Sequence, residues 1–371
     1  MAAPIPVFIN ARFLTEPLTG LQRWGREVLR ELDAMIEDGS IDGNAYRFQL
    51  LSPSQPEDMP RYRHLELKVK GPLRSHLWEQ LVLPRAAKGF LINLKNTAPT
   101  RHRNMSVQIQ DLQPIARPET HTALFNRAYQ WILPRAARNA KVTFALSEST
   151  ALEINKYFGT PLERITVTGA GHEHVLRIEP DDGIIKKHDL QRNGFLLAVS
   201  SLNPNKNFAA ILRAMTIADV KVPLVIAGGT NPRVFEGKEG VESLPENAIH
   251  VGRVTDEELR ALYEHALGFV YPSFYEGWGL PPGEAMLLGC PVISSNTTSL
   301  PEVCGDAALY CDPADDESIA KQLFRLVEDG PLRQELSAFG RARSSQFTWR
   351  AVAEKVWKAV EPAILASDKS K

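Results

Sequence analysis

Short apolar runs alternate with longer amphipathic stretches along most of this chain. The first run, at 7–9, is followed by a turn with Gly20 and by a helical pattern over 21–32. Later apolar runs, each followed by a polar or glycine-containing loop, lie at 107–111, 142–147, 195–199, 224–229, 249–254 and 268–273. Buried strands that alternate with helices predict parallel sheets of the Rossmann type. Ligands of such sheets bind at the carboxyl ends of the strands.

Length and polarity predict where these elements divide into domains. At 371 residues the chain is long for one core, and about two domains are expected. The charged stretch 179–187 has the composition of a linker. We therefore predict a first domain over 1–180, a second over 188–348, and an amphipathic terminal helix within 349–371.

Composition narrows the class of protein. Hydrophobic residues make up 43% and charged residues 23%, as in ordinary globular proteins. No apolar run approaches the roughly 20 residues of a membrane span, and the first residues lack a signal-peptide pattern. The three cysteines show no CxxC spacing, so neither zinc nor a redox pair is expected. These features favour a cytoplasmic protein.

Charge is distributed unevenly along the chain. Up to His172 there are 22 lysines and arginines against 16 acidic residues, whereas the remainder has 21 against 28. A basic first domain suits an anionic acceptor or peripheral contact with an anionic membrane, and nothing indicates nucleic acid. Two apolar-aromatic segments of this half, 77–87 and 129–137, share a Leu-Pro-Arg-Ala-Ala sequence. Packing on the sheet is the commoner role for such helices, and contact with lipid headgroups is the alternative.

The most informative segment contains Glu276 and Glu284 with seven residues between them. Glycines at 277 and 279 can take positive φ and let the backbone approach a ligand. The prolines that follow suit a helix start, which places Glu276 on the loop and Glu284 in the first helical turn. Free amides at a helix start bind phosphate, and carboxylates accept hydrogen bonds from vicinal hydroxyls. Together these features predict a site for a nucleotide-sugar.

This segment and those after it resemble a known family. Residues 274–286, 289–296, 299–303 and 305–313 are similar to the retaining glycosyltransferases of family 4, the group 1 glycosyltransferases. The resemblance implies an α/β GT-B fold, with two Rossmann-like domains that face each other across a cleft and a C-terminal helix that crosses back to the first domain. It assigns the donor sugar's hydroxyls to Glu276 and the ribose to Glu284.

The resemblance also implies roles for residues outside the two-glutamate segment. Lys206 takes the position of a lysine that binds the donor diphosphate, and the backbone from Gly252 to Val254 borders the nucleobase. The predicted catalytic residues are Lys206, Glu276, Asp111 and Gln110. The predicted donor-binding residues are Gly20, Asn207, Gly252, Val254, Gly277, Trp278, Gly279, Leu280 and Glu284.

Two positions depart from the family pattern. Gln110 replaces the usual histidine; a glutamine can position a sugar but cannot carry a proton near neutral pH. Ser200 replaces an arginine that many relatives have. Both departures favour the main alternative, a non-catalytic GT-B protein that binds a nucleotide-sugar or scaffolds a partner enzyme. An epimerase or hydrolase on this fold would need an acid–base pair, for which only Asp111 and Glu276 are candidates.

We therefore predict a hexosyltransferase that uses a nucleotide-sugar donor and a glycan or lipid-linked glycan acceptor. The overall sequence, and no single specificity residue, favours mannose from GDP-mannose as the donor. It favours a growing lipopolysaccharide O-chain or exopolysaccharide as the acceptor. No Asp-x-Asp motif is present, and His172 and His174 lack further ligand candidates nearby. No metal and no other cofactor are expected.

Overall fold

The computed structural model of the chain describes residues 3–120, 122–199, 203–229 and 247–369. It divides into two compact units, the first formed by Met1–Gly171 with Trp349–Lys371 and the second by His172–Thr348. The first unit thus ends at Gly171, not at residue 180. The predicted linker is also wrong, because its residues include helix α7 (Gly183–Lys187), which packs on α9 (Asp256–His265) of the second unit. Ile184 and Ile185 are buried there, and the charged residues around them obscured this pair in the sequence.

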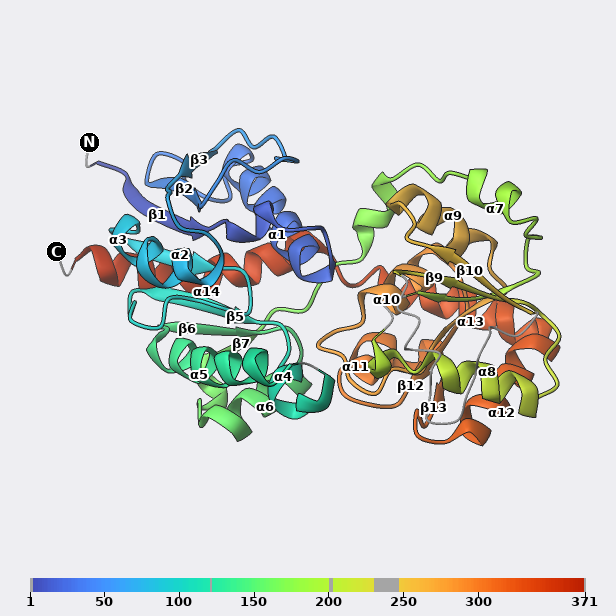
Figure 1. Ribbon diagram of the computed structural model, residues 1–371. Coiled ribbons are helices and arrows are strands. Elements are labelled where there is room, and N and C mark those ends of the chain that lie inside the picture. Colours follow the sequence, from blue (N-terminus) through green and yellow to red (C-terminus); the bar gives the residue numbers. More distant parts are fainter. Residues whose placement is uncertain (1–2, 121, 200–202, 230–246, 370–371) are drawn as a thin grey trace. The chain divides into compact units, whose positions relative to one another are not determined.

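The first unit is built on a seven-stranded parallel sheet with the order β3-β2-β1-β4-β5-β6-β7 (Figure 1). Its strands are β1 (Ile5–Asn10), β2 (Tyr46–Ser52), β3 (Leu65–Val69), β4 (Phe90–Asn93), β5 (Met105–Ile109), β6 (Val142–Ala145) and β7 (Ile165–Val167). The order reverses between β1 and β4. At such a switch point the loops that follow the two central strands diverge and leave room for a ligand.

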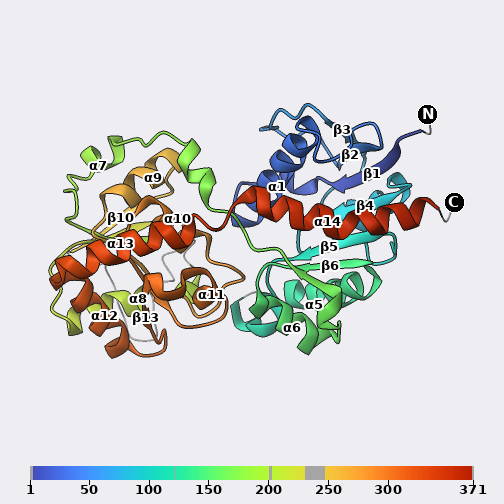
Figure 2. The ribbon, with the colours of Figure 1, turned by 180° about the vertical axis from the view of Figure 1, so that it is seen from behind.

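Helices cover both faces of this sheet. They are α1 (Gly20–Glu37), α2 (Ser75–Leu81), α3 (Leu83–Ala86), α4 (Gln113–Ala116), α5 (Ala123–Asn139), α6 (Glu148–Phe158) and α14 (Trp349–Asp368), with 3-10 turns η1 (Arg12–Thr15), η2 (Pro118–Thr120) and η3 (Leu162–Arg164). The terminal helix α14 packs on α1, β4 and β6 (Figure 2) and buries Trp349, Val356 and Val360. The prediction that the last helix belongs with the first domain agrees with this packing.

The second unit has a six-stranded parallel sheet with the order β10-β9-β8-β11-β12-β13. Its strands are β8 (Leu196–Val199), β9 (Leu224–Ala227), β10 (Ala248–Gly252), β11 (Gly268–Tyr271), β12 (Val292–Ser295) and β13 (Ala308–Cys311). Its remaining helices are α8 (Phe208–Ile217), α10 (Leu280–Leu288), α11 (Leu300–Cys304), α12 (Asp316–Glu328) and α13 (Gly330–Ser344), with 3-10 turns η4 (Glu173–Arg177), η5 (Pro204–Lys206) and η7 (Gly305–Ala307).

The second sheet reverses its order between β8 and β11. The loop after β8 leads to Lys206, and the loop after β11 carries Glu276. The sequence prediction of two Rossmann-like parallel sheets is confirmed. The structure places Lys206 and Glu276 on the two loops that flank the switch point.

Candidate active site

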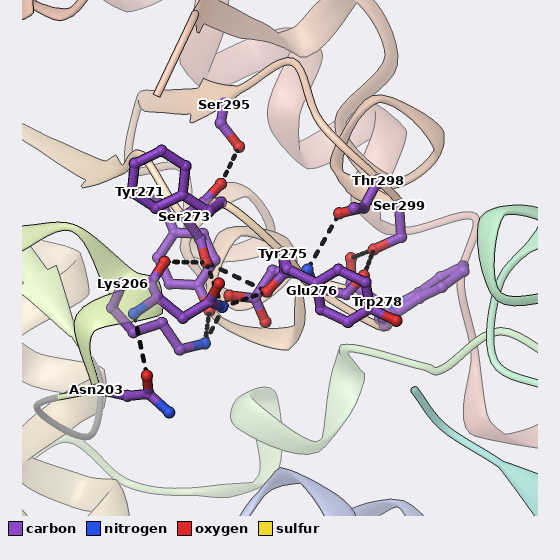
Figure 3. Close-up of polar contacts among 12 residues, drawn as sticks. Asn203, Lys206, Tyr271, Ser273, Tyr275, Glu276, Trp278, Ser295, Thr298 and Ser299 are labelled. Carbon is purple, nitrogen blue, oxygen red and sulfur yellow. Dashed lines mark hydrogen bonds and ion pairs between the residues drawn. The ribbon is translucent and has the colours of Figure 1, made fainter. Parts of the chain in front are cut away.

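Lys206 and Glu276 form an ion pair at the carboxyl end of the second sheet. The Lys206 Nζ lies 2.6 Å from Glu276 Oε1 and donates a second hydrogen bond to the Tyr271 hydroxyl at 2.8 Å (Figure 3). The Lys206 and Glu276 side chains keep 18% and 13% of their surface exposed, so a ligand can reach both. The cation predicted for the diphosphate and the carboxylate predicted for the sugar therefore lie together.

Tyr271, the last residue of β11, forms the floor under this pair. Its ring lies below the ammonium, with 5.1 Å from Nζ to the ring centroid, an arrangement that favours a cation. Burial, and then the nearby Glu276 carboxylate, raise the pKa of the Tyr271 hydroxyl well above its ordinary value. Tyr271 thus stays a neutral phenol that positions Lys206. The sequence pattern places Tyr271 in the strand and indicates no further role for it.

Asn205 ties the two loops of the site together. Its Nδ2 donates to the Tyr275 carbonyl at 2.6 Å, and its own carbonyl accepts from the Phe274 amide at 2.9 Å. The Ser273 hydroxyl donates to the same Asn205 carbonyl at 3.1 Å. Buried hydrogen bonds of this kind fix relative position because breaking one leaves an unsatisfied group. Asn205 therefore sets the Lys206–Glu276 spacing, a positioning role that the sequence analysis missed.

Hydroxyl side chains of 295–299 hold the Glu276 loop from its other side (Figure 3). Ser295 Oγ donates to the Ser273 carbonyl at 2.6 Å, and Thr298 Oγ1 accepts from the Glu276 amide at 3.1 Å. Ser299 Oγ lies 3.0 Å from the Glu276 carbonyl and 2.6 Å from that of Trp278. The loop is thus fixed through its backbone, which leaves the Glu276 side chain available to a ligand.

The start of α10 offers fewer amides than expected. The helix begins at Leu280, and Pro281 and Pro282, which follow, have no N–H group. The expected anion site made of helix-start amides is therefore wrong in detail. Instead, the backbone N–H groups of Gly277, Trp278, Gly279 and Leu280 have no hydrogen-bond partner within the described residues. Successive free amides of a loop can bind an anion as helix amides do. Of the two loop glycines, only Gly279 has positive φ, at 127°.

Glu284 lies in the second turn of α10, not in the first as predicted. It is buried, and its two carboxylate oxygens contact His174 Nε2 at 3.0 Å and the Tyr263 hydroxyl at 3.3 Å. Each carboxylate oxygen can accept more than one hydrogen bond, so the predicted contact with a ribose hydroxyl is compatible with these partners. His174 was set aside in the sequence analysis, and the structure makes it the partner of Glu284.

A chain of hydrogen bonds fixes Trp278 inside the second unit. The Trp278 Nε1–H donates to His172 Nε2 at 3.1 Å, which leaves the imidazole proton on Nδ1 for Ser344 Oγ at 2.8 Å. The Ser344 hydroxyl then donates to the Gly283 carbonyl at 2.7 Å. The indole of Trp278 is therefore part of the core, and of this predicted donor-binding residue only the backbone can face a ligand.

His172 is fully buried in this chain. Burial is the main cause that lowers its pKa to about 3, and the nearby His174 adds to the effect, while Glu284 opposes it. A neutral imidazole is required for the observed order of donors and acceptors. His172 thus supports the loop and α10 and is unsuited to proton transfer at neutral pH.

The other predicted donor-binding residues of the second unit lie on neighbouring loops. Asn207 has φ of 59°, and its Nδ2 donates to the Pro313 carbonyl at 2.7 Å. Gly252 ends β10 with φ of 78°, its carbonyl accepts from the Gly228 amide at 2.7 Å, and Val254 follows it. Asn207 and Val254 follow the carboxyl ends of strands of the second sheet, the ends at which Lys206 also lies. Ser200 lies outside the described residues.

The predicted residues of the first unit meet at the carboxyl ends of β1 and β5. Gly20 is the first residue of α1, with no positive φ, so it belongs to the helix and not to the preceding loop. Gln110 is buried. Its backbone N–H donates to Asn96 Oδ1 at 2.5 Å, and its side-chain Nε2 donates to the Leu21 carbonyl at 3.4 Å. Asp111 Oδ1 accepts from the Gln113 amide at 3.1 Å. Gln110 thus links β5 to the start of α1.

A buried carboxylate that the sequence analysis missed lies at the end of β1. Glu79 Oε1 accepts from Asn10 Nδ2 at 2.9 Å and lies 3.4 Å from Arg12 Nε. Burial by itself raises the pKa of Glu79, but the Arg12 guanidinium and hydrogen bonds from His76, Thr97 and Asn10 outweigh it and hold the pKa at about 2. This network fixes the carboxyl edge of the first sheet. Without knowledge of the fold, Glu79 reads as one more helix surface residue.

Comparison with known proteins identifies the class. Residues 181–343 match the family model described as glycosyl transferases group 1. The chain is 29% identical over 370 residues to O-antigen chain mannosyltransferase B of Escherichia coli, over 91% of this chain and 95% of that protein. It is 27% identical to O-antigen chain mannosyltransferase RfbU of Salmonella typhimurium, over 64% of this chain and 66% of that protein.

The fold has close counterparts among solved structures. A sucrose-phosphate synthase from Thermosynechococcus elongatus superposes with a TM-score of 0.77 at 17% identity, over 99% of this chain and 100% of that one. The family prediction made from the two-glutamate segment is thus confirmed. Residues 181–343 match the group 1 glycosyltransferases, and the two parallel-sheet units of the chain match the GT-B fold.

Two features of the described residues bear on the predicted partners. No helix among them combines the length and apolar character needed to cross a membrane. Nor do these residues contain a cluster of three or more histidine, cysteine or acidic side chains placed to hold a metal ion. Metal independence stays a prediction.

Proposed function

We propose that this glycosyltransferase transfers a hexose, mannose from GDP-mannose being the favoured donor, to a growing glycan such as a lipopolysaccharide O-chain, with retention of anomeric configuration. The observation that carries the proposal is the partly buried but solvent-accessible Lys206–Glu276 pair on the two loops at the switch point. The similarity to two O-antigen chain mannosyltransferases supports the choice of sugar and acceptor.

The pair suits a donor that joins a sugar to a diphosphate. Lys206 offers a cation where negative charge builds up on the leaving diphosphate, an effect of the type that lowers transition-state energy most. The four free amides from Gly277 to Leu280 add dipoles of the same sign nearby. Glu276 accepts hydrogen bonds from sugar hydroxyls, and Glu284 from the ribose.

The reaction that fits these groups needs no enzymatic nucleophile. The bond from the anomeric carbon to the phosphate oxygen breaks, the acceptor hydroxyl oxygen bonds to the same face of that carbon, and its proton passes to the departing phosphate. Gln110 has no proton to exchange at neutral pH, and its contacts with Asn96 and Leu21 suit a positioning role. Asp111 and Gly20 complete the proposed first-unit residues.

The test is a thermal-shift screen against UDP, GDP, ADP and their common sugar conjugates without added metal, followed by turnover assays. Stabilisation by one nucleotide, increased by one sugar, identifies the donor. That donor should then release nucleoside diphosphate in the presence of a mannose-terminated oligosaccharide. Donor binding without turnover on any such acceptor would instead support the non-catalytic alternative, and no shift with any nucleotide would contradict the site itself.

We also propose that the first unit contacts an anionic membrane through α2 and α5. Large apolar side chains of these helices face solvent: Leu77 is 64%, Leu81 47%, Leu124 81%, Phe125 36% and Trp131 48% exposed. The two helices contact each other through His76 and Tyr129, whose ring centroids are 6.1 Å apart. The alternative in the sequence analysis, lipid contact by these segments, therefore has structural support.

Charge favours the same partner. Residues 70–141 contain twelve lysines and arginines against three acidic residues, and one of those three, Glu79, is buried. Basic residues near an anionic bilayer contribute about 1 kcal/mol each, and exposed aromatic and leucine side chains add apolar insertion. Arg135 lies over the Trp131 ring, 4.5 Å from its centroid, so one cation accompanies an inserting side chain.

Vesicle co-sedimentation tests this surface. Wild-type protein should bind vesicles with 30% phosphatidylglycerol and not pure phosphatidylcholine, and Leu124→Glu should release it. Phe324→Glu is the matched control, because Phe324 is 55% exposed on α12 of the second unit. Equal loss in both variants, or binding that ignores lipid charge, would exclude the α2–α5 surface.

A further inference from the structure

The second unit has a pocket at the amino ends of its strands, on the side of the sheet opposite to the active site. It measures about 770 Å³ and is lined by Asn193, Leu267 and Pro291, which precede β8, β11 and β12. Lys206 and Glu276 follow the other ends of β8 and β11. Helices α9 and α13 complete the walls. The volume lies within the range of small-molecule sites, and the proposed donor chemistry makes no use of it.

Four arginines line this pocket against a single acid. They are Arg192, Arg260, Arg333 and Arg341, and the acid is Glu264. Their formal charge is three positive. Helices α9, α10 and α12 end beside the pocket, and each C-terminus contributes about half a negative charge. The helix ends thus offset about half of this net charge, and the pocket remains positive.

Part of the arginine set has a structural role, which is the simplest explanation for it. Arg333 Nη1 donates to the Leu326 and Val327 carbonyls, both at 2.7 Å, and Arg341 Nη2 donates to the Leu288 carbonyl at 2.8 Å. Arg260 bonds Glu264 at 2.8 Å. The contacts of Arg333 and Arg341 satisfy carbonyls at helix ends, as basic residues often do.

The structural role leaves donors unused. A guanidinium has five N–H groups, and Nε and Nη2 of Arg333 and Nε of Arg341 bond nothing in the part of the chain that the structure describes. Arg192 is exposed and has no hydrogen bond or ion pair to any described residue, so helix capping does not explain it. Ser337 and Gln334 add a hydroxyl and an amide to the lining. Several forked cationic donors with neutral donors between them match the oxygen atoms of a phosphate.

We propose that this pocket binds the phosphate group of a small phosphorylated molecule or of a phospholipid headgroup. Tyr263 contacts both regions: it is one of the residues that line the pocket, and its hydroxyl contacts Glu284 Oε2 at 3.3 Å. The site is distinct from the donor diphosphate site and holds its ligand whether or not the donor is present.

Isothermal titration with inorganic pyrophosphate tests the proposal in full-length protein that carries Lys206→Ala, so that the donor site loses its cation. We expect this protein to bind pyrophosphate. Adding Ser337→Glu, which places a carboxylate among the arginines, should weaken binding about tenfold, a change of about 1.4 kcal/mol. Ala342→Glu is the control, because Ala342 is exposed on the same helix, makes the same charge change and is not part of the lining.

Arg192→Gln provides a second variant that leaves the helix caps intact. It should also weaken pyrophosphate binding, and both variants should melt like their parent. Absence of binding in the Lys206→Ala protein, or equal affinity of the Ser337→Glu and Ala342→Glu proteins, would overturn the proposal.

Vesicles distinguish the two sources of phosphate. The test uses bilayers of phosphatidylcholine with 30% phosphatidylglycerol and protein that carries Leu124→Glu, which disables the α2–α5 surface. Residual binding that Ser337→Glu removes and Ala342→Glu retains assigns the pocket to a lipid headgroup. Pyrophosphate binding without any such vesicle binding assigns it to a soluble phosphorylated molecule.

Discussion

Lys206 Nζ and Glu276 Oε1, 70 residues apart in sequence, lie 2.6 Å from each other at the switch point of the second sheet. Without a ligand each neutralises the other, so neither partly buried charge is left unpaired. A bound nucleotide-sugar offers an anion to the lysine and hydroxyl donors to the carboxylate. The ion pair therefore keeps both groups in place until the donor replaces their mutual contact.

Replacing Lys206 tests the role of the cation. We expect Lys206→Ala to lower kcat by about 10²–10³-fold, the size typical for loss of one group that stabilises developing negative charge. Steady-state release of nucleoside diphosphate measures the effect. Lys221→Ala is the matched control, because among the described residues Lys221 pairs with Asp219 alone, on the exposed surface of the same unit. Near-normal turnover of Lys206→Ala would remove this lysine from the mechanism.

The two glutamates should fail in different ways. Glu276→Ala should impair use of the donor sugar more than nucleotide binding, since Glu276 faces the proposed sugar position. Glu284→Ala should mainly weaken nucleotide binding, because its proposed partner is the ribose. Titration with the nucleoside diphosphate alone, compared with kcat/KM for the full donor, separates the two effects.

Glu284 requires a second variant, because it is buried against His174 and Tyr263. Glu284→Gln keeps the volume and one acceptor, and should retain the fold while nucleotide affinity falls. If Glu276→Ala and Glu284→Ala changed both measurements by the same factor, separate hydroxyl-binding roles would be ruled out.

Much of the fold and part of the site could be predicted from local sequence. Short apolar runs predicted β1, β5 and β6 of the first sheet and β8, β9, β10 and β11 of the second. The loop from Phe274 to Leu280 predicted a nucleotide-sugar ligand. These signals are local, because strand length and turn chemistry depend on neighbouring residues. The start of α9 is equally local, because Thr255 and Glu258 form a capping box within one helical turn.

What the sequence could not provide are contacts between distant residues. His172 and Trp278 are 106 positions apart, and His174 and Glu284 are 110 apart. Nothing local distinguishes a buried histidine that supports a loop from one on the surface. The prediction of free amides at the start of α10 was wrong for a different reason. The sequence showed both prolines, but which backbone amides they remove depends on the residue at which the helix begins, and sequence patterns do not fix that residue.

The buried His172 predicts an acid-sensitive second unit. Its pKa in the folded state is about 3, below the ordinary value of 6.5, so the unfolded chain binds a proton that the folded chain excludes. The contribution of neutral His172 to the free energy of unfolding is fully present above about pH 6.5. It falls as pH decreases toward 3, with a slope of about 1.4 kcal/mol per pH unit.

Thermal unfolding between pH 6.5 and 5 measures this slope before most carboxylates titrate. His172→Gln, which cannot take up a proton, should have lower stability at pH 7 but a flatter dependence on pH over this range. Parallel curves for the wild type and His172→Gln would show that the acid sensitivity arises elsewhere.

Gly283 should not tolerate a side chain, although it lies inside a helix. A Cβ atom there would lie 2.3 Å from His172 Cε1 and Nε2. Alanine is favoured over glycine by about 1 kcal/mol in helices, but overpacking of a rigid core costs about 1–3 kcal/mol. Because His172 is fixed by Trp278 and Ser344, it cannot move aside, and we expect Gly283→Ala to be destabilising.

Equilibrium unfolding in urea measures this effect against Gly330→Ala, where the nearest atom to a new Cβ is 3.6 Å away at the end of the Arg333 side chain. Gly330→Ala should be neutral or slightly stabilising. The double variant His172→Ala with Gly283→Ala should be more stable than the sum of the two single changes predicts, since removing the imidazole makes room for the methyl group. Strict additivity would mean that the two residues do not constrain each other, and the account of why α10 has a glycine at position 283 would have to be abandoned.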